Sequence, residues 1–204
     1  MSPLRKELEK HLKEMCQEMG FKKNRSSYYV KQVNEDTYGT LGFSIVSYQK
    51  KGHLFLSFLV GVSYRPLEEI FSKYGEIKFN GIYPTLSRQI GYFTPAHKFF
   101  EWDYHADVDK VEFFNEVNDT IIRYGYPVFQ KYSDPDALME AFSCGDVGAS
   151  IVSLTAGKAI LYYLKGAKDK AFECLEERRI KNRKFGNEAE VKFDENFRKL
   201  LSNE

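Results

Sequence analysis

The fold is decided by nine residues in the first half of the chain, LFLSFLVGV from Leu54 to Val62. In an extended strand, successive side chains point to opposite faces. One face then consists of Leu54, Leu56, Phe58, Val60 and Val62. The opposite face carries Phe55, Ser57, Leu59 and Gly61. A wholly apolar face and a mixed one are typical of a central strand that lines a core on one side and is partly covered on the other.

Two further strands are expected immediately before this one, Tyr28 to Val33 and Leu41 to Tyr48. Both are rich in β-branched and aromatic residues, which favour strands. Short polar breaks at residues 34–36 and 50–52 separate the three segments. Breaks of this length allow neighbouring strands to turn back on each other, so we predict an antiparallel meander.

Helices are predicted on both sides of this sheet. Ser2 and Pro3 are typical of a helix start, and Leu4, Leu8 and Leu12 follow at helical spacing. Asp107 is expected to cap a helix with a stripe of Val111, Phe114, Val117 and Ile121 that ends at Gly125 and Pro127. Other helices are expected over residues 66–74, 134–145, 151–164, 168–183 and 190–201, and short extended segments over residues 86–93 and 99–104.

The order of these segments predicts an α+β fold, with a mainly antiparallel sheet packed against an N-terminal helix and C-terminal helices. We expect a single domain over residues 1–204, in which residues 1–147 form the helix and sheet core and residues 148–204 form a docked helical extension. A chain of 204 residues with 43% hydrophobic residues is long and apolar enough to bury such a core.

The amino-acid composition argues against several functional classes of protein. The net charge of +1 lacks the strong basic excess of a dedicated nucleic-acid binder. Cys16, Cys144 and Cys174 are odd in number and form no CxxC pair, so neither disulfides nor a zinc site is expected. The charged N-terminus resembles no signal peptide, and no apolar run is long enough for a membrane helix. We therefore expect a cytoplasmic protein with no cofactor and no membrane partner, whose oligomeric state the sequence leaves open.

An acidic block runs from Glu101 to Asp119, where seven carboxylates accompany one base, Lys110. It also contains the single tryptophan, Trp102. Carboxylates around an aromatic anchor are suited to a basic protein partner. The predicted contact residues are Trp102, Asp103, Asp107, Glu112 and Glu116. The alternatives are a solvated helix face and a tryptophan buried in the core.

An enzymatic alternative uses the histidines of the same region. His97, Asp103, His105 and Asp107 together offer nitrogen and oxygen ligands for a divalent metal that would activate water for hydrolysis. Their spacing matches no established metal motif. In the simpler interpretation these side chains are solvated and Asp107 caps a helix.

A second alternative, which the net charge of +1 does not favour, is nucleic-acid binding through a basic block. This block consists of Arg178, Arg179, Lys181, Arg183 and Lys184. Such a cluster can contact phosphates, but it is also typical of a solvated helix end.

The order of several landmarks resembles a family of uncharacterised bacterial proteins, domain of unknown function 4304. The landmarks are Gly20-Phe21-Lys22-Lys23, Tyr28-Tyr29-Val30-Lys31, Gly61-Val62, Trp102 and Tyr126-Pro127-Val128-Phe129. The resemblance implies a bacterial cytoplasmic α+β domain with no assigned catalytic residues and a role of toxin-immunity or defence type. With the absence of a catalytic motif, it predicts a non-enzymatic protein-binding module.

Overall fold

The computed structural model describes residues 2–25, 27–48, 50–145, 148, 154–182 and 188–203, without the side chains of residues 178–182 and 203. Within these ranges, six strands form one sheet. They are β1 (Lys22–Arg25), β2 (Tyr28–Gln32), β3 (Thr37–Val46), β4 (His53–Tyr64), β5 (Leu86–Gln89) and β6 (Trp102–His105). The helices are α1 (Pro3–Glu18), α2 (Arg65–Gly75), α3 (Lys110–Thr120), α4 (Tyr126–Lys131), α5 (Pro135–Cys144), α6 (Leu154–Leu164), α7 (Lys168–Asn182) and α8 (Glu188–Asn203). A 3₁₀ turn, η1 (Ile90–Phe93), and a π-helical turn, η2 (Ile121–Gly125), complete the order.

The sheet has the order β1-β2-β3-β4-β5, and every pairing in it is antiparallel. The sixth strand, β6, also pairs with β4, antiparallel and on the half that β5 leaves open. Leu59 to Val62 pair with β5, whereas His53 to Leu56 pair with β6. The predicted α+β class and antiparallel sheet are confirmed.

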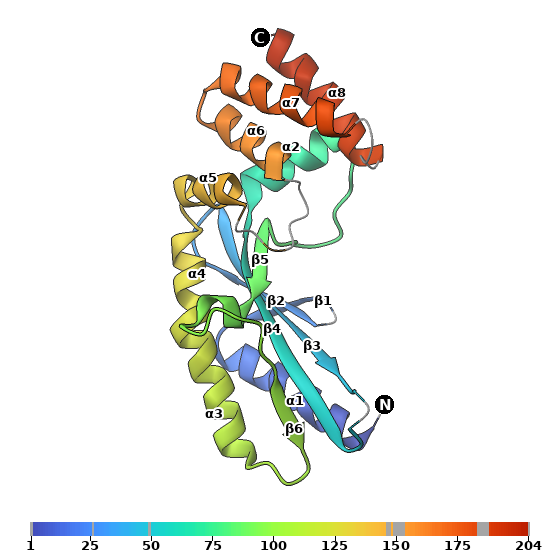
Figure 1. The fold of residues 1–204 in the computed structure, drawn as a ribbon, viewed down its shortest axis with the longest axis vertical. Helices are drawn as coiled ribbons and strands as arrows, with labels where there is room; N and C mark the ends of the chain where they lie inside the picture. The colour runs from blue at the N-terminus through green and yellow to red at the C-terminus, as the bar shows by residue number, and fades with distance from the viewer. Residues whose placement is uncertain are drawn as a thin grey trace.

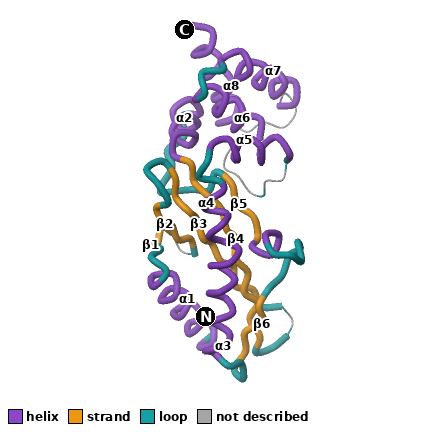
Figure 2. The backbone as a smooth tube through the Cα atoms, turned by 90° about the vertical axis from the view of Figure 1, so that its left-hand side faces the viewer, coloured by secondary structure: helices purple, strands orange, loops and turns teal. Residues whose placement is uncertain are grey.

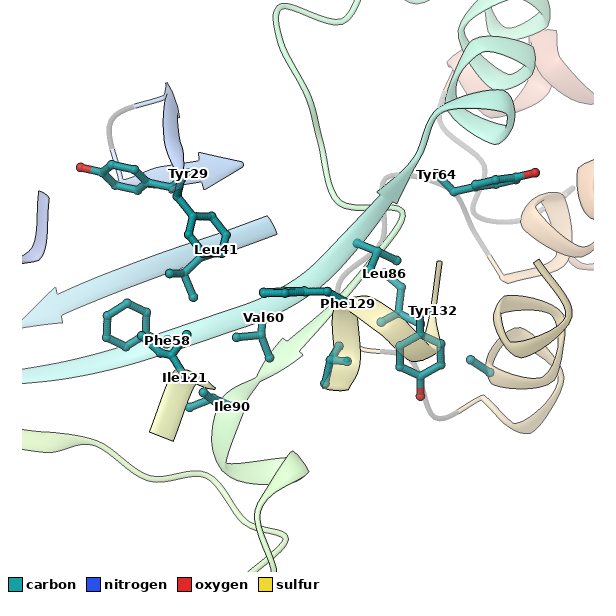
Figure 3. Packing of buried hydrophobic residues seen from close by; sticks show 14 of the residues in the cluster. Tyr29, Leu41, Phe58, Val60, Tyr64, Leu86, Ile90, Ile121, Phe129 and Tyr132 are labelled. Carbon is teal, nitrogen blue, oxygen red and sulfur yellow. The ribbon is translucent and has the colours of Figure 1, made fainter. Parts of the chain in front are cut away.

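The core lies on one face of the sheet. The five predicted inward residues of β4 are all buried: Leu54, Leu56, Phe58, Val60 and Val62. Helices α1 and α3 to α4 cover this face (Figures 1 and 2). Figure 3 shows Phe58 and Val60 of β4 among core side chains that include Ile121 of η2 and Phe129 of α4. The N-terminal helix contributes Leu8 and Leu12, neither of which is exposed.

A group of helices forms one end of the molecule (Figure 1). Strand β4 runs directly into α2, which carries the chain from the sheet into this group. The ring of Phe71 in α2 lies 5.0 Å from that of Phe193 in α8, and Tyr74 lies 5.5 Å from Phe197. The amide of Asn196 donates to the carbonyl of Tyr74 at 3.0 Å. Thus α8 packs on α2 through aromatic side chains.

The strand β3 begins at Thr37, four residues before the predicted start. Gly39 lies in the part that the prediction missed, and Gly42 lies in the part that it included. Both positions accommodate an aromatic ring. A Cβ at Gly39 would lie 2.8 Å from the ring of Phe129, and one at Gly42 would lie 2.7 Å from the ring of Tyr28. Close approach of a ring is a physical reason for glycine within a strand.

The helix after β6 differs from its prediction at both ends. Its N-cap is Asp109, not Asp107, and Asp109 Oδ1 accepts from the amides of Val111 and Glu112 at 2.9 and 3.0 Å. Val111 is 72% exposed, and the buried stripe is Phe113, Val117 and Ile121. The helix does not end at Gly125 and Pro127 either.

The chain instead passes through the π turn η2 straight into α4. Proline lacks the amide hydrogen that a regular helix would use there, and it is tolerated in the first turn of a helix. Pro127 occupies that position of α4. The π turn therefore allows the helix to continue through Pro127, although proline at this point in the sequence predicts a helix end.

All three cysteines are free. Cys16 and Cys174 are buried, and burial raises the pKa of the Cys16 thiol to about 12. In the described part of the chain, no helix is both long and apolar enough to cross a bilayer.

Candidate functional site

The acidic block folds into a groove between β6 and α3, which we call the acidic groove. Its volume is about 350 Å³. The lining residues are Phe100, Glu101, Trp102, Asp103, Val108, Asp109, Glu112, Phe113 and Glu116. Strand, turn and first helical turns are contiguous in sequence, so the carboxylates meet because the chain reverses direction at Asp107 to Asp109. Five carboxylates and no basic side chain therefore line this groove.

The one base of the acidic block faces away from the groove. Lys110 forms an ion pair with Glu7 of α1. This pairing lowers the pKa of Glu7, the first cause being the hydrogen bond from Lys110. Glu112 and Glu116 are exposed and form no ion pair with any described side chain. Their charges are thus free to act on a ligand.

Trp102 forms part of the groove wall and is not an exposed anchor. It is 5% exposed, and its ring packs edge-on against Phe100 at 4.3 Å and Phe58 at 5.9 Å. Its indole Nε1 donates to Glu116 Oε1 at 3.1 Å. The indole ring therefore belongs to the core, as the alternative interpretation predicts, and its N–H edge reaches the acidic groove.

Of the remaining predicted contact residues, three line the acidic groove and one lies outside it. Glu112, Glu116 and Asp103 line the groove, whereas Asp107 lies exposed in the turn before it. Glu101, which the prediction omitted, lines the groove and accepts a hydrogen bond from the Tyr48 hydroxyl at 3.0 Å. Glu101 belongs to the acidic block, but only the fold shows which carboxylates of that block line the groove and which lie outside it.

Asp103 is held by two basic side chains on the outer face of the sheet. His53 Nδ1 lies 2.7 Å from Asp103 Oδ1, and Lys50 Nζ donates to Oδ2 at 3.0 Å. Burial raises the pKa of Asp103, but the bonds and charges of His53 and Lys50 outweigh it, so the pKa lies below its ordinary value. Asp103 is therefore ionised near neutral pH.

The predicted metal set is not brought together as four residues. Asp103 and His105 share the outer face of β6. His97 follows η1 and packs edge-on against Tyr92, and Asp107 is exposed in its turn. Across the described ranges, no three histidine, cysteine, aspartate or glutamate side chains are grouped to hold a metal ion. The residue that joins Asp103 and His105 is His53, which the sequence analysis did not select.

No side chain of the predicted basic block belongs to the described part of the structure. Arg178, Arg179 and Lys181 fall within α7 but without described side chains, and Arg183 and Lys184 fall in the undescribed range 183–187. Nucleic-acid binding through this block stays a prediction.

A second pocket, of about 410 Å³, lies beside α2 and contains a buried carboxyl group. Glu68 is 3% exposed and accepts from the hydroxyls of Ser63 and Thr85, the latter at 3.4 Å. Burial raises the pKa of Glu68 to about 7, against the opposing effects of Ser63, Arg65 and Thr85. Glu68 could not be singled out from the sequence, since a glutamate in the first turn of a helix is ordinary.

Replacing Glu68 with glutamine is expected to flatten the pH dependence of stability. An ordinary glutamate ionises near pH 4.5, so between that pH and about 7 the folded protein keeps a proton that the unfolded chain loses. The free energy of unfolding therefore falls as pH rises through this window and levels off above it. At pH 8, Glu68→Gln should be more stable than the wild type by about 3 kcal/mol.

Urea unfolding at pH 4, 6 and 8 measures this difference. The matched control is Glu69→Gln, because Glu69 is the exposed neighbour, 3.4 Å from Arg65. Identical pH profiles for the wild type and Glu68→Gln would contradict the assignment.

Comparisons of the chain with protein-family models, with curated proteins and with solved structures give no match. The resemblance to domain of unknown function 4304 thus depends on the landmarks alone.

Proposed function

We propose that this chain is a protein-binding module whose acidic groove takes a basic segment of a partner protein. The observation that carries the proposal is the convergence of five carboxylates on one groove that no basic residue lines. Of these five, Asp103 is the one paired with described basic side chains, Lys50 and His53. The family resemblance favours a basic, toxin-like protein as the partner.

The groove offers charge and apolar surface together. Phe100, Val108 and Phe113 contribute apolar surface beside Glu112 and Glu116. Arginine and lysine side chains combine a charged head with an apolar stem, so such a surface complements both parts. Complementary charge also accelerates association with a basic partner and disfavours acidic ones.

Hydrogen bonds hold two of the groove carboxylates in place. Glu116 accepts from the Trp102 indole, and Glu101 accepts from Tyr48. Fixed acceptors lose less conformational entropy on binding than free side chains do. These contacts support a groove that is organised before its partner arrives.

The test measures binding of a labelled arginine- and lysine-rich peptide by fluorescence anisotropy, with Trp102 emission as a second signal. Glu112→Gln with Glu116→Gln removes two groove charges while keeping an acceptor for Trp102. At 0.2–1 kcal/mol for each exposed pair, we expect the affinity to fall about tenfold.

The matched control is Asp107→Asn with Asp119→Asn, which removes the same charge from the same acidic block outside the groove. It should bind the peptide as the wild type does. Equal losses in both variants would assign binding to overall charge. A chain that binds labelled single-stranded DNA but not the peptide would contradict the proposal and favour the basic block.

A further inference from the structure

Two histidines face each other across neighbouring strands at the end of the sheet that carries β6. His53 of β4 and His105 of β6 are direct partners in the antiparallel register, and their ring centroids lie 4.8 Å apart. They belong to the outer face of the sheet, opposite the core residues Leu54 and Tyr104 that follow and precede them. Figure 1 shows these two strands side by side at the end away from the helical group.

This part of the outer face is open to solvent. The His53 side chain is 21% exposed, His105 is partly exposed, and Tyr48 nearby is 57% exposed. Ser44 of β3, the strand next to β4, lies on the same face and is exposed as well. A small ion can therefore reach both imidazole rings without any rearrangement of the core.

Asp103 fixes which nitrogen of His53 is available. An ionised carboxylate only accepts hydrogen bonds, so the contact of 2.7 Å makes His53 Nδ1 the donor. In the neutral ring, the lone pair then lies on Nε2. Carboxylate, histidine and metal are arranged in this way in many metalloproteins, where the carboxylate orients the ring and makes it a better ligand.

The distance between the rings suits one shared ion. With metal to nitrogen distances of about 2.1 Å, two imidazoles on one ion have ring centroids roughly 4.5–5.2 Å apart for ligand angles between square-planar and tetrahedral. The separation of 4.8 Å falls within this range. Two positive charges directly opposite each other on a sheet would repel, whereas two neutral rings can share an ion.

We propose that His53 and His105 form a two-histidine site for a divalent ion of the zinc, nickel and copper class, with Asp103 as the positioning residue. Imidazole ligands select this class over magnesium and calcium, which prefer oxygen. Two protein ligands leave further coordination positions open to water or to a donor group of a bound molecule. The site lies on the outer face and shares Asp103 with the acidic groove, but its two histidine ligands do not line that groove.

The test uses untagged full-length protein with Cys144→Ser throughout, because Cys144 is the exposed thiol. Calorimetry with Zn²⁺ alone should give one ion per chain, and Mg²⁺ should not compete. A Zn²⁺ concentration about a hundred times the Kd should raise Tm by about 5–10 °C, and EDTA should reverse the rise.

His53→Gln with His105→Gln should abolish this binding, and Asp103→Ala should weaken it about tenfold or more. The chain has four histidines, so His11→Gln with His97→Gln is the matched control and should bind Zn²⁺ as the parent does. Circular dichroism of each variant verifies the fold. Absence of binding by the parent, or equal binding by the His53 and His105 variant, would overturn the proposal.

Discussion

Replacing Phe58 with aspartate is expected to unfold the protein. Phe58 has no exposed surface, and its ring lies 5.9 Å from Trp102 and 6.0 Å from Phe43. A buried carboxylate without a partner costs several kcal/mol, and loss of the ring costs about 3–5 kcal/mol more. Together these are comparable to the whole stability of a domain, about 5–15 kcal/mol.

Circular dichroism during a thermal melt tests this expectation. The control is Ser57→Asp, the preceding residue of β4, which faces the other side of the sheet opposite Ser44. Ser57→Asp should retain a cooperative melt. A Phe58→Asp protein that melts like the wild type would show that this face of β4 is not the core.

Replacing Phe193 with alanine should produce the second largest loss of stability. Phe193 has no exposed surface and lies 5.0 Å from Phe71 and 4.9 Å from Phe197. Truncation of such a ring lowers the free energy of unfolding by about 3–5 kcal/mol. For a chain of this length, Tm should fall by roughly 6–20 °C.

The same experiment tests whether the chain is a single domain. Far-UV circular dichroism reports mainly the helices, whereas Trp102 fluorescence reports the sheet. Because α2 continues β4 without a loop, we expect both signals to change together in Phe193→Ala. Val191→Ala, at a half-exposed position of the same helix, should have little effect. Loss of the helical signal before that of Trp102 would indicate two domains.

The sequence predicted the sheet where apolar residues alternate and failed where other contacts decide. β4 was found because its core face is wholly apolar. β1 was missed because its four residues, Lys22 to Arg25, are all polar and only their pairing with β2 makes them a strand. The continuous helix from α3 to α4 was missed because a π turn is invisible in a pattern that treats glycine and proline as a stop.

The site shows the same limit. Asp103, Glu112 and Glu116 of the acidic groove could be predicted because they belong to one acidic block in the sequence, whereas Glu101 and Asp109 were recognised as lining residues from the fold. His53 could not, because it lies 50 residues from Asp103 and only the register of β4 with β6 brings them together. The hydrogen bonds that Glu68 accepts likewise come from two other segments, from Ser63 in β4 and from Thr85 just before β5.

The position of β6 at the margin of the sheet affects how the molecule behaves toward its own copies. In the described part of the chain, β6 pairs only with β4, so its other edge is unpaired. Unpaired edges invite strands of other molecules and promote aggregation, and charge along an edge is one protection against it. Glu101 and Asp103 place two carboxylates along this margin. If the acidic groove takes a basic segment as proposed, the same carboxylates would disfavour pairing of β6 with a second copy of itself, because like charges would then lie opposite each other.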